Sequence, residues 1–247
     1  MKIIKAKKTK VSDIDFQNLD FGSVFSDHMF TCSFSDGEWD EGIIEPYKPI
    51  LMDPSARTLH YGQACFEGMK AYKDSNGKPW LFRPIENYKR IVKSCKRLAM
   101  PEIPEKIFMD GVSKLVDIDK EWIKPGIGNS LYIRPFIFAD QPSINANEAN
   151  QYKFMIICAP AQLYYSGDMK VKIEKSFSRA AKGGVGYAKA AGNYAAQFYP
   201  TILARDEGYQ QIIWTDSSSH EYIEEAGTMN LFFRINDTLI TPPTNDS

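Results

Sequence analysis

The chain has 247 residues, of which 43% are hydrophobic and 25% are charged. This is the composition of an ordinary globular protein, and the length is sufficient for two modest domains. The formal net charge is −1, from 30 basic and 31 acidic residues, so the charge balance gives no reason to expect a nucleic-acid or membrane partner. No apolar run approaches the ~20 residues of a membrane span, and the basic start at 2–10 lacks the apolar core of a signal peptide.

The cysteines and histidines are scattered along the chain. Cys32, Cys65, Cys95 and Cys158 form no close pairs in the sequence. This spacing favours a reduced, cytoplasmic protein without a disulfide framework. The three histidines are isolated as well, so we expect no metal site.

The first half of the chain predicts short strands and two helices. A loop with the aromatic residues Tyr61 and Phe66 leads into a short strand, and Asn76-Gly77 predicts a hairpin turn. Residues 86–99 and 107–123 each carry an apolar stripe at helical spacing, and a proline follows each of them.

Residues 130–138, SLYIRPFIF, alternate in the manner of a strand. Tyr132, Arg134 and Phe136 share one face, while aliphatic residues occupy the other. Pro135 indicates an edge strand. From this pattern alone, Arg134 is either a surface side chain or part of a site.

A segment rich in proline, glycine and polar residues, 160–168, predicts a boundary between two domains. We expect a small N-terminal α/β domain at 1–163, a linker at 164–169 and the start of a larger domain at 170–247. The remaining strands are expected at 152–159, where the apolar run favours a central strand, and at 169–177, 211–215, 222–226 and 230–235.

The second domain should also contain one helix at 194–206 that Gly208 terminates. Its apolar residues Phe198, Ile202 and Leu203 are expected to face inward. Pro200 lies inside this helix and is expected to kink or delimit its first turn.

The stretch 183–194, GGVGYAKAAGNY, surrounds Lys189 with glycines and alanines. Small neighbours let a flat ligand approach closely, and an apolar pocket lowers the pKa of a lysine. A neutral, enclosed amine can form a Schiff base with a carbonyl or with pyridoxal phosphate (PLP). An ordinary loop lysine is the alternative. The phosphate-loop and dinucleotide motifs do not fit, because Ala190 follows the lysine and no apolar strand precedes the stretch.

Glu224 and Glu225 adjoin each other on an expected strand, so their side chains should point to opposite faces. A carboxylate beside a pyridine nitrogen would hold that nitrogen protonated, and the turn at 227–230 offers backbone N–H groups and a hydroxyl for an anion. A solvated pair of glutamates is the alternative.

Six motifs in this order resemble the branched-chain aminotransferases, which are PLP enzymes of fold type IV. They are LHYGQACFEGMKAY, FRPIENYKR, SLYIRP, GGVGYAKAAGNY, YIEEAGTMNLFF and LITPP, and the resemblance extends from about residue 34 to residue 243. It implies an α/β (α+β) chain with the two-domain, D-amino acid aminotransferase-like fold of type IV. Family members continue beyond the last motif, so we expect the second domain to be incomplete.

The same resemblance assigns roles to individual residues. Lys189 would form the Schiff base with pyridoxal 5'-phosphate and move the substrate proton, and Glu225 would pair with the pyridine nitrogen. Arg90 would bind the phosphate, although helical periodicity places it opposite the apolar stripe, where solvent is expected. Tyr194 would bind the phenolic oxygen, and Thr228 would hold cofactor and substrate. The residues implied to line the substrate pocket, besides Thr228, are Tyr61, Phe66, Tyr132 and Arg134.

The implied reaction is amino-group transfer between branched-chain L-amino acids and 2-oxoglutarate in a cytoplasmic homodimer. Two alternatives of the same fold type are a D-amino acid aminotransferase and an aminodeoxychorismate lyase. SLYIRP and FEGMKAY favour the branched-chain group. A third alternative is an inactive, truncated remnant that acts as a dimerisation or binding module.

Overall fold

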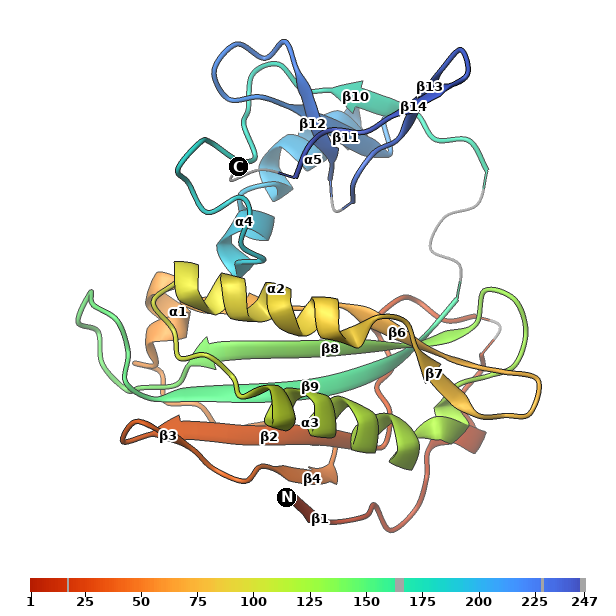
Figure 1. The fold of residues 1–247 in the computed structure, drawn as a ribbon, viewed down its shortest axis with the longest axis vertical. Coiled ribbons are helices and arrows are strands. Elements are labelled where there is room, and N and C mark those ends of the chain that lie inside the picture. The colour runs from red at the N-terminus through yellow and green to blue at the C-terminus, as the bar shows by residue number, and fades with distance from the viewer. Residues whose placement is uncertain (17, 163–166, 228, 245–247) are drawn as a thin grey trace. The chain divides into compact units, whose positions relative to one another are not determined.

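The computed structural model describes residues 1–16, 18–162, 167–227 and 229–244. The chain divides into two compact units, residues 1–165 and 166–247, and each has a sheet of its own (Figure 1). Residues 164–166 of the expected linker lie outside the described residues. Pro160 is part of a strand rather than of the expected boundary segment, because β9 continues to Ala161.

Within its described residues, the first unit contains a nine-stranded sheet. Its strand order is β1-β4-β2-β9-β8-β6-β7, with β3 beside β2 and β5 beside β8, and only the β1–β4 pair is parallel. The strands are β1 (Lys2–Ile3), β2 (His28–Ser35), β3 (Glu38–Trp39), β4 (Ile43–Pro46), β5 (Ala64–Phe66), β6 (Met69–Lys73), β7 (Pro79–Leu81), β8 (Ser130–Ala139) and β9 (Tyr152–Ala161).

Strand β8 lies inside this sheet, so the expectation that Pro135 marks an edge strand is wrong. β5 and β6 both pair with β8 in one continuous register, in which Phe66 lies opposite Phe136 and Glu67 opposite Pro135. The backbone N–H of Glu67 donates to the carbonyl of Pro135 over 2.7 Å. An antiparallel pair of this kind exchanges two hydrogen bonds, and proline has no N–H for the second. The proline therefore costs the interior of the sheet one hydrogen bond.

Two long helices cover one face of the sheet (Figure 1). They are α2 (Pro84–Arg97) and α3 (Glu105–Ile118), and both begin two residues earlier than the periodicity predicts. Pro84 suits the first turn of α2 because its missing N–H has no helical partner there. The expected helix at 107–123 is shorter, because the chain tightens into a 3-10 turn, η2 (Lys120–Trp122), after Ile118. The other helical elements of the first unit are η1 (Val11–Asp13) and α1 (Arg57–Tyr61).

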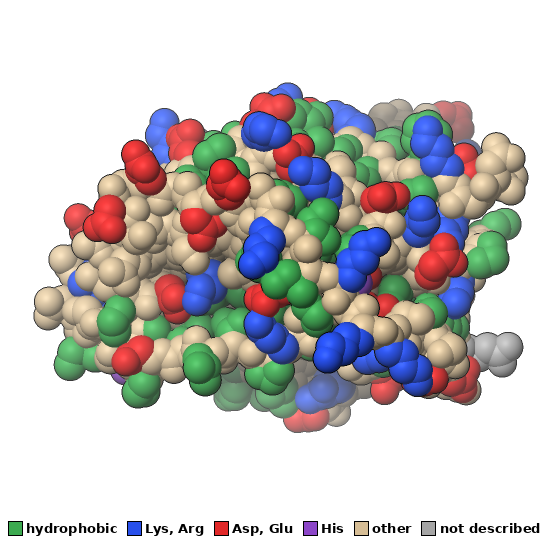
Figure 2. Space-filling model, turned by 90° about the horizontal axis from the view of Figure 1, so that it is seen from below, with side chains coloured by type: hydrophobic (Ala, Val, Ile, Leu, Met, Phe, Trp, Pro, Cys, Tyr) green, Lys and Arg blue, Asp and Glu red, His purple; other side chains and the backbone are tan. Residues whose placement is uncertain are grey.

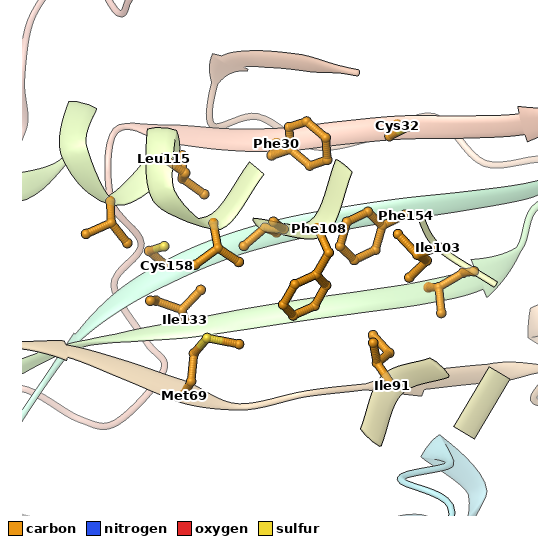
Figure 3. Packing of buried hydrophobic residues seen from close by; sticks show 14 of the residues in the cluster. Phe30, Cys32, Met69, Ile91, Ile103, Phe108, Leu115, Ile133, Phe154 and Cys158 are labelled. Carbon is orange, nitrogen blue, oxygen red and sulfur yellow. The ribbon is translucent and has the colours of Figure 1, made fainter. Parts of the chain in front are cut away.

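The core of the first unit lies between these helices and the sheet (Figure 3). Phe108 of α3 stacks on Phe154 of β9 with ring centroids 5.9 Å apart, and Phe30 of β2 meets Phe154 edge-on at 5.8 Å. Ile91 of α2 and Leu115 of α3 are fully buried in the same cluster. Burial of each such side chain stabilises the fold by about 1.5–3 kcal/mol. This packing fixes α2, and with it Arg90, against the sheet.

The opposite face of the sheet carries a second, smaller apolar cluster around Met29, Phe138 and Met155. No long helix covers this face among the described residues (Figure 1). The surface shown in Figure 2 carries basic and acidic side chains interspersed, as expected from the nearly balanced charge. No helix in the described ranges has the length and apolar character needed to cross a bilayer.

The second unit is built on a three-stranded sheet of β10 (Val171–Ile173), β11 (Gln211–Thr215) and β12 (Ile223–Ala226). β10 and β11 are parallel, and β11 and β12 are antiparallel. β10 is shorter than the strand expected at 169–177, because the chain turns at Glu174. The Glu174 carboxylate is buried and accepts hydrogen bonds from the next three backbone N–H groups. A hairpin of β13 (Phe233–Ile235) and β14 (Thr238–Ile240) completes the unit.

The single helix expected at 194–206 is two helices, α4 (Ala191–Ala195) and α5 (Phe198–Asp206). The expected inward face is wrong as well, because Phe198 and Ile202 are 64% and 44% exposed. Pro200 and Ala204 are buried instead. The small Ala204 lets α5 approach the ring of Trp214 on β11, and this contact determines which face of the helix is covered.

Candidate active site

Lys189 lies in the loop before α4, between the buried residues Ala188 and Ala190. Its side chain is half-buried, and its Nζ donates to Tyr194 Oη over 2.6 Å. Lys189 Nζ also lies 5.1 Å from the centre of the Tyr194 ring. The structure therefore brings together the lysine and the tyrosine that the sequence predicted as site residues, and it orients the amine.

Asn193 holds the lysine loop in place. Its side-chain amide is buried and donates to the backbone carbonyls of Val185 and Ala188, each over 2.9 Å. These two bonds close the loop on the first turn of α4, so the position of Lys189 depends on the helix. Asn193 was not predicted as a site residue from the sequence, although it lies directly before Tyr194 in the glycine-rich stretch.

Glu225 lies on β12 opposite Trp214 of β11. Burial raises the pKa of the Glu225 carboxyl, and the charge of Glu224 acts in the same direction, whereas Arg179 and Lys189 oppose it. Arg179 Nη1 is 2.5 Å from Glu225 Oε1. The second unit thus places a carboxylate, an arginine and the lysine within electrostatic range of one another.

The turn after β12 is closed by reciprocal backbone hydrogen bonds between Ala226 and Met229. A Cβ added at Gly227 would lie 2.1 Å from Gln211 Oε1, so any side chain there would displace the Gln211 side chain. Thr228, which the resemblance implies as a contact to cofactor and substrate, lies outside the described residues.

In the first unit, Arg90 forms a two-pronged ion pair with Glu67. Arg90 Nε and Nη2 lie 2.5 and 2.7 Å from the two carboxylate oxygens. The Glu67 side chain is fully buried, whereas 51% of the Arg90 side chain is exposed. Asn87 Nδ2 and the backbone N–H of Gly68 donate to the same carboxylate over 2.8 and 3.1 Å. Arg90 therefore faces solvent, as its periodicity predicts, and is also held in one orientation.

Three of the predicted pocket residues lie together on β5 and β8. The guanidinium of Arg134 is 4.4 Å from the centre of the Phe66 ring, and its Nη2 donates to Tyr132 Oη over 2.9 Å. Gly68 makes this arrangement possible, because a Cβ there would lie 2.1 Å from Tyr132 Oη. Tyr61 lies apart on α1, and its hydroxyl donates to the backbone carbonyl of Ile144.

The sheet separates these two groups of the first unit. In the register of β5 and β6 with β8, Phe66 and Gly68 lie opposite Phe136 and Arg134 on one face. Glu67 points to the other face, which α2 covers, because successive side chains alternate. The short stretch Phe66-Glu67-Gly68 thus supports Arg90 on one side of the sheet and the Arg134 cluster on the other.

Comparison with known proteins gives a family for this arrangement. The family model described as "Amino-transferase class IV" matches residues 64–247. The chain belongs to the class IV aminotransferases. Within this family it groups with the branched-chain aminotransferases. The branched-chain-amino-acid transaminase 1 of Bacillus subtilis is 41% identical to it over 253 aligned residues, which cover 100% of this chain and 71% of that protein.

Other relatives of this class IV aminotransferase agree. A probable branched-chain-amino-acid aminotransferase of Staphylococcus epidermidis is 45% identical over 238 residues, 94% of this chain and 66% of that protein. The solved branched-chain amino acid aminotransferase from Escherichia coli has a TM-score of 0.67 at 27% identity, and the match covers 89% of this chain and 68% of that one. The fold class expected from the sequence, fold type IV, is confirmed. The chain spans about two thirds of the length of these relatives.

Two charged residues of this aminotransferase, Glu67 and Arg179, were not predicted from the sequence. Glu67 lies inside a motif that was quoted, but its partner Arg90 is on a helix, and only the fold brings the two together. Arg179 lies just before the glycine-rich stretch. Its only signal in the sequence is that it is the one arginine between the start of β10 and α4.

Proposed function

We propose that this protein is a PLP-dependent transaminase that moves amino groups between branched-chain L-amino acids and 2-oxoglutarate, releasing branched 2-oxo acids and glutamate. The observation that carries the proposal is the Lys189–Tyr194 contact of 2.6 Å in the same unit as Glu225. The branched-chain names of relatives at 41–45% identity support the substrate class.

The residues of the second unit fit this cofactor. The lysine amine could react with the aldehyde of the cofactor, and the tyrosine hydroxyl beside it could bind the neighbouring phenolic oxygen. The buried carboxylate could pair with a protonated ring nitrogen. Another branched-chain amino acid aminotransferase, 25% identical to this chain with a TM-score of 0.64, was solved with pyridoxamine 5'-phosphate. When bound, the cofactor supplies an electron sink for the bond broken at the substrate α-carbon.

The chain's own residues would handle protons and orientation. Lys189 would take the proton from the substrate α-carbon and return it elsewhere, as a general base and then a general acid. Tyr194 would keep the amine pointed at the reacting atoms, and Glu225 would hold a proton at the ring nitrogen. Thr228 is proposed to contribute to cofactor and substrate binding on the resemblance alone.

The first unit would contribute the remaining contacts. Arg90 is proposed to bind the phosphate, and Glu67 to orient its guanidinium for that task. Phe66, Tyr132 and Arg134 would form part of the substrate pocket, as would Tyr61.

We further propose that the enzyme is a cytoplasmic homodimer. The four cysteines are free and buried, which favours a reducing compartment. Leu51, Leu59 and Ile144 are 97%, 59% and 66% exposed, and a partner subunit would cover such apolar side chains. Sedimentation at micromolar concentration tests the dimer, and a monomer there would contradict it.

Borohydride reduction tests the central proposal. The chain would be incubated with PLP, reduced and digested, and the label should map to Lys189. Lys189→Ala should remove both the visible absorbance band and the label, whereas the exposed Lys182→Ala serves as a matched control from the same loop. A label on Lys182 or Lys70 instead would refute the assignment.

Substrate assays separate the branched-chain reaction from its alternatives. L-Leucine, L-isoleucine and L-valine with 2-oxoglutarate should be turned over, and D-alanine and aminodeoxychorismate should not. The reverse pattern would favour the other type IV activities. PLP binding without turnover of any of these substrates would favour the inactive remnant.

A further inference from the structure

We infer that Arg179 is a positioning residue for the ring nitrogen of the cofactor, acting through Glu225. The inference rests on the proposed function, because it concerns how the same carboxylate is prepared for its task. Arg179 would hold Glu225 ionised and fix one of its oxygens, leaving the other to face the nitrogen.

The ion pair is short and poorly solvated. Arg179 Nη1 lies 2.5 Å from Glu225 Oε1, and the two side chains are only 8% and 28% exposed. Arginine stays charged under all ordinary conditions. A charge this close, shielded little by water, strongly favours the ionised form of the carboxylate.

The second oxygen of the carboxylate can serve as a further hydrogen-bond acceptor. Among the described residues, the contact of the ion pair with Arg179 is made by Oε1. A carboxylate has acceptor capacity on both oxygens. One oxygen can therefore receive the guanidinium while the other receives a ring N–H.

The burial of Arg179 is not explained by packing alone. Its Nε is buried and has no hydrogen-bond partner among the described residues. A buried donor without an acceptor costs about 1–3 kcal/mol. An apolar side chain of similar size would avoid that cost, so the guanidinium requires a role beyond filling space.

The loop that carries Arg179 is anchored to the strand next to Glu225. The backbone N–H of Glu174 donates to the Ile213 carbonyl over 2.9 Å, and Thr215 Oγ1 donates to the Glu174 carbonyl over 2.6 Å. The Phe177 ring then meets Tyr199 of α5 edge-on, with centroids 5.8 Å apart. These contacts tie the loop to β11 and α5, so the guanidinium approaches Glu225 from a fixed direction.

Two cofactors that differ at one atom test the inference. The probes are PLP and 1-deazapyridoxal 5'-phosphate, an analogue in which carbon replaces the ring nitrogen. The dissociation constant of each probe is measured with the 247-residue chain. Arg179→Met should weaken PLP binding about tenfold more than it weakens binding of the analogue, because one pKa unit corresponds to a factor of ten. Arg179→Lys should retain most of the wild-type preference for PLP over the analogue. Arg205→Met, on the exposed end of α5, should leave that preference unchanged.

A second readout needs no cofactor. Carboxyl 13C NMR titration of Glu225 in the cofactor-free chain should show its pKa higher by about one unit or more in Arg179→Met, since an opposite charge is lost. The charges of Glu224 and Lys189 also act on this carboxyl, and both residues are unchanged in the variant. In a Glu225→Gln background, Arg179→Met should change PLP binding less than twofold.

The outcomes separate the two proposals. Equal weakening of PLP and the analogue by Arg179→Met would show a purely structural role and overturn the inference. An unchanged Glu225 pKa would overturn it as well. Failure of the unmodified chain to bind PLP would refute the proposed function, while the titration would still decide whether Arg179 controls Glu225.

Discussion

Glu67→Gln is the sharpest test of how the first unit prepares Arg90. The wild-type carboxylate is fully buried and accepts four hydrogen bonds, two from Arg90 and one each from Asn87 and Gly68. Glutamine keeps the volume but points an amide group at these donors. Each lost bond to a charged group is worth about 1.5–3 kcal/mol. Half of the Arg90 side chain is exposed and can hydrogen-bond to water when the pair is broken. We therefore expect the free energy of unfolding to fall by about 2–3 kcal/mol, which is less than the sum of the individual bonds.

Urea denaturation followed by tryptophan fluorescence measures this loss. Trp122 is buried in the same unit and reports its unfolding. Glu86→Gln is the matched control, because Glu86 is on α2 but its ion-pair partners in the described part of the chain are exposed, and surface pairs are worth about 0–1 kcal/mol. A Glu67→Gln variant within about 0.5 kcal/mol of the wild type would refute the account of the buried ion pair.

Three further changes have definite expected results. Gly68→Ala should lower the free energy of unfolding by about 1–3 kcal/mol, measured by thermal denaturation, because its Cβ would overlap Tyr132 Oη; an unchanged melting temperature would contradict this. Burial raises the pKa of Asp27, but three hydrogen bonds outweigh burial and hold the pKa below the ordinary 3.8. Asp27→Asn should therefore lower the free energy of unfolding at neutral pH. The difference from the wild type should disappear as the pH falls below 3.8. Glu225→Gln should slow turnover by about 10²–10³, whereas Glu224→Gln should not, and the opposite result would show that the assigned register of β12 is wrong.

The sequence predicted elements well where one period dominates. The stripes on α2 and α3 and the alternation of β8 located these elements to within a few residues, because their buried faces are large and regular. The buried face of α5 was predicted wrongly, because the small Ala204 packs against Trp214 and the largest apolar residues of the helix do not. The prediction that Pro135 marks an edge strand was wrong because an interior strand can tolerate the loss of a single hydrogen bond.

Contacts between residues of the candidate site could be predicted only where the residues belong to one local motif. Lys189 and Tyr194 are five residues apart, so one loop and one helical turn bring them together. The partners of Arg90 and Glu225 come from other elements, and no local pattern in the sequence connects Arg179 with Glu225. Ion pairs of this kind arise from tertiary structure, so they cannot be derived from propensity or periodicity.

The single register of β5 and β6 along β8 has a consequence for how this chain can vary. One added or deleted residue between Cys65 and Met69 would move Glu67 to the open face of the sheet and turn a neighbour toward α2. The spacing in this stretch is therefore dictated by the sheet rather than by any ligand. We expect homologous chains with other substrate preferences to keep the number of residues in this stretch constant, and to keep Glu67 and Gly68, whose surroundings leave no room for another side chain without a loss of stability.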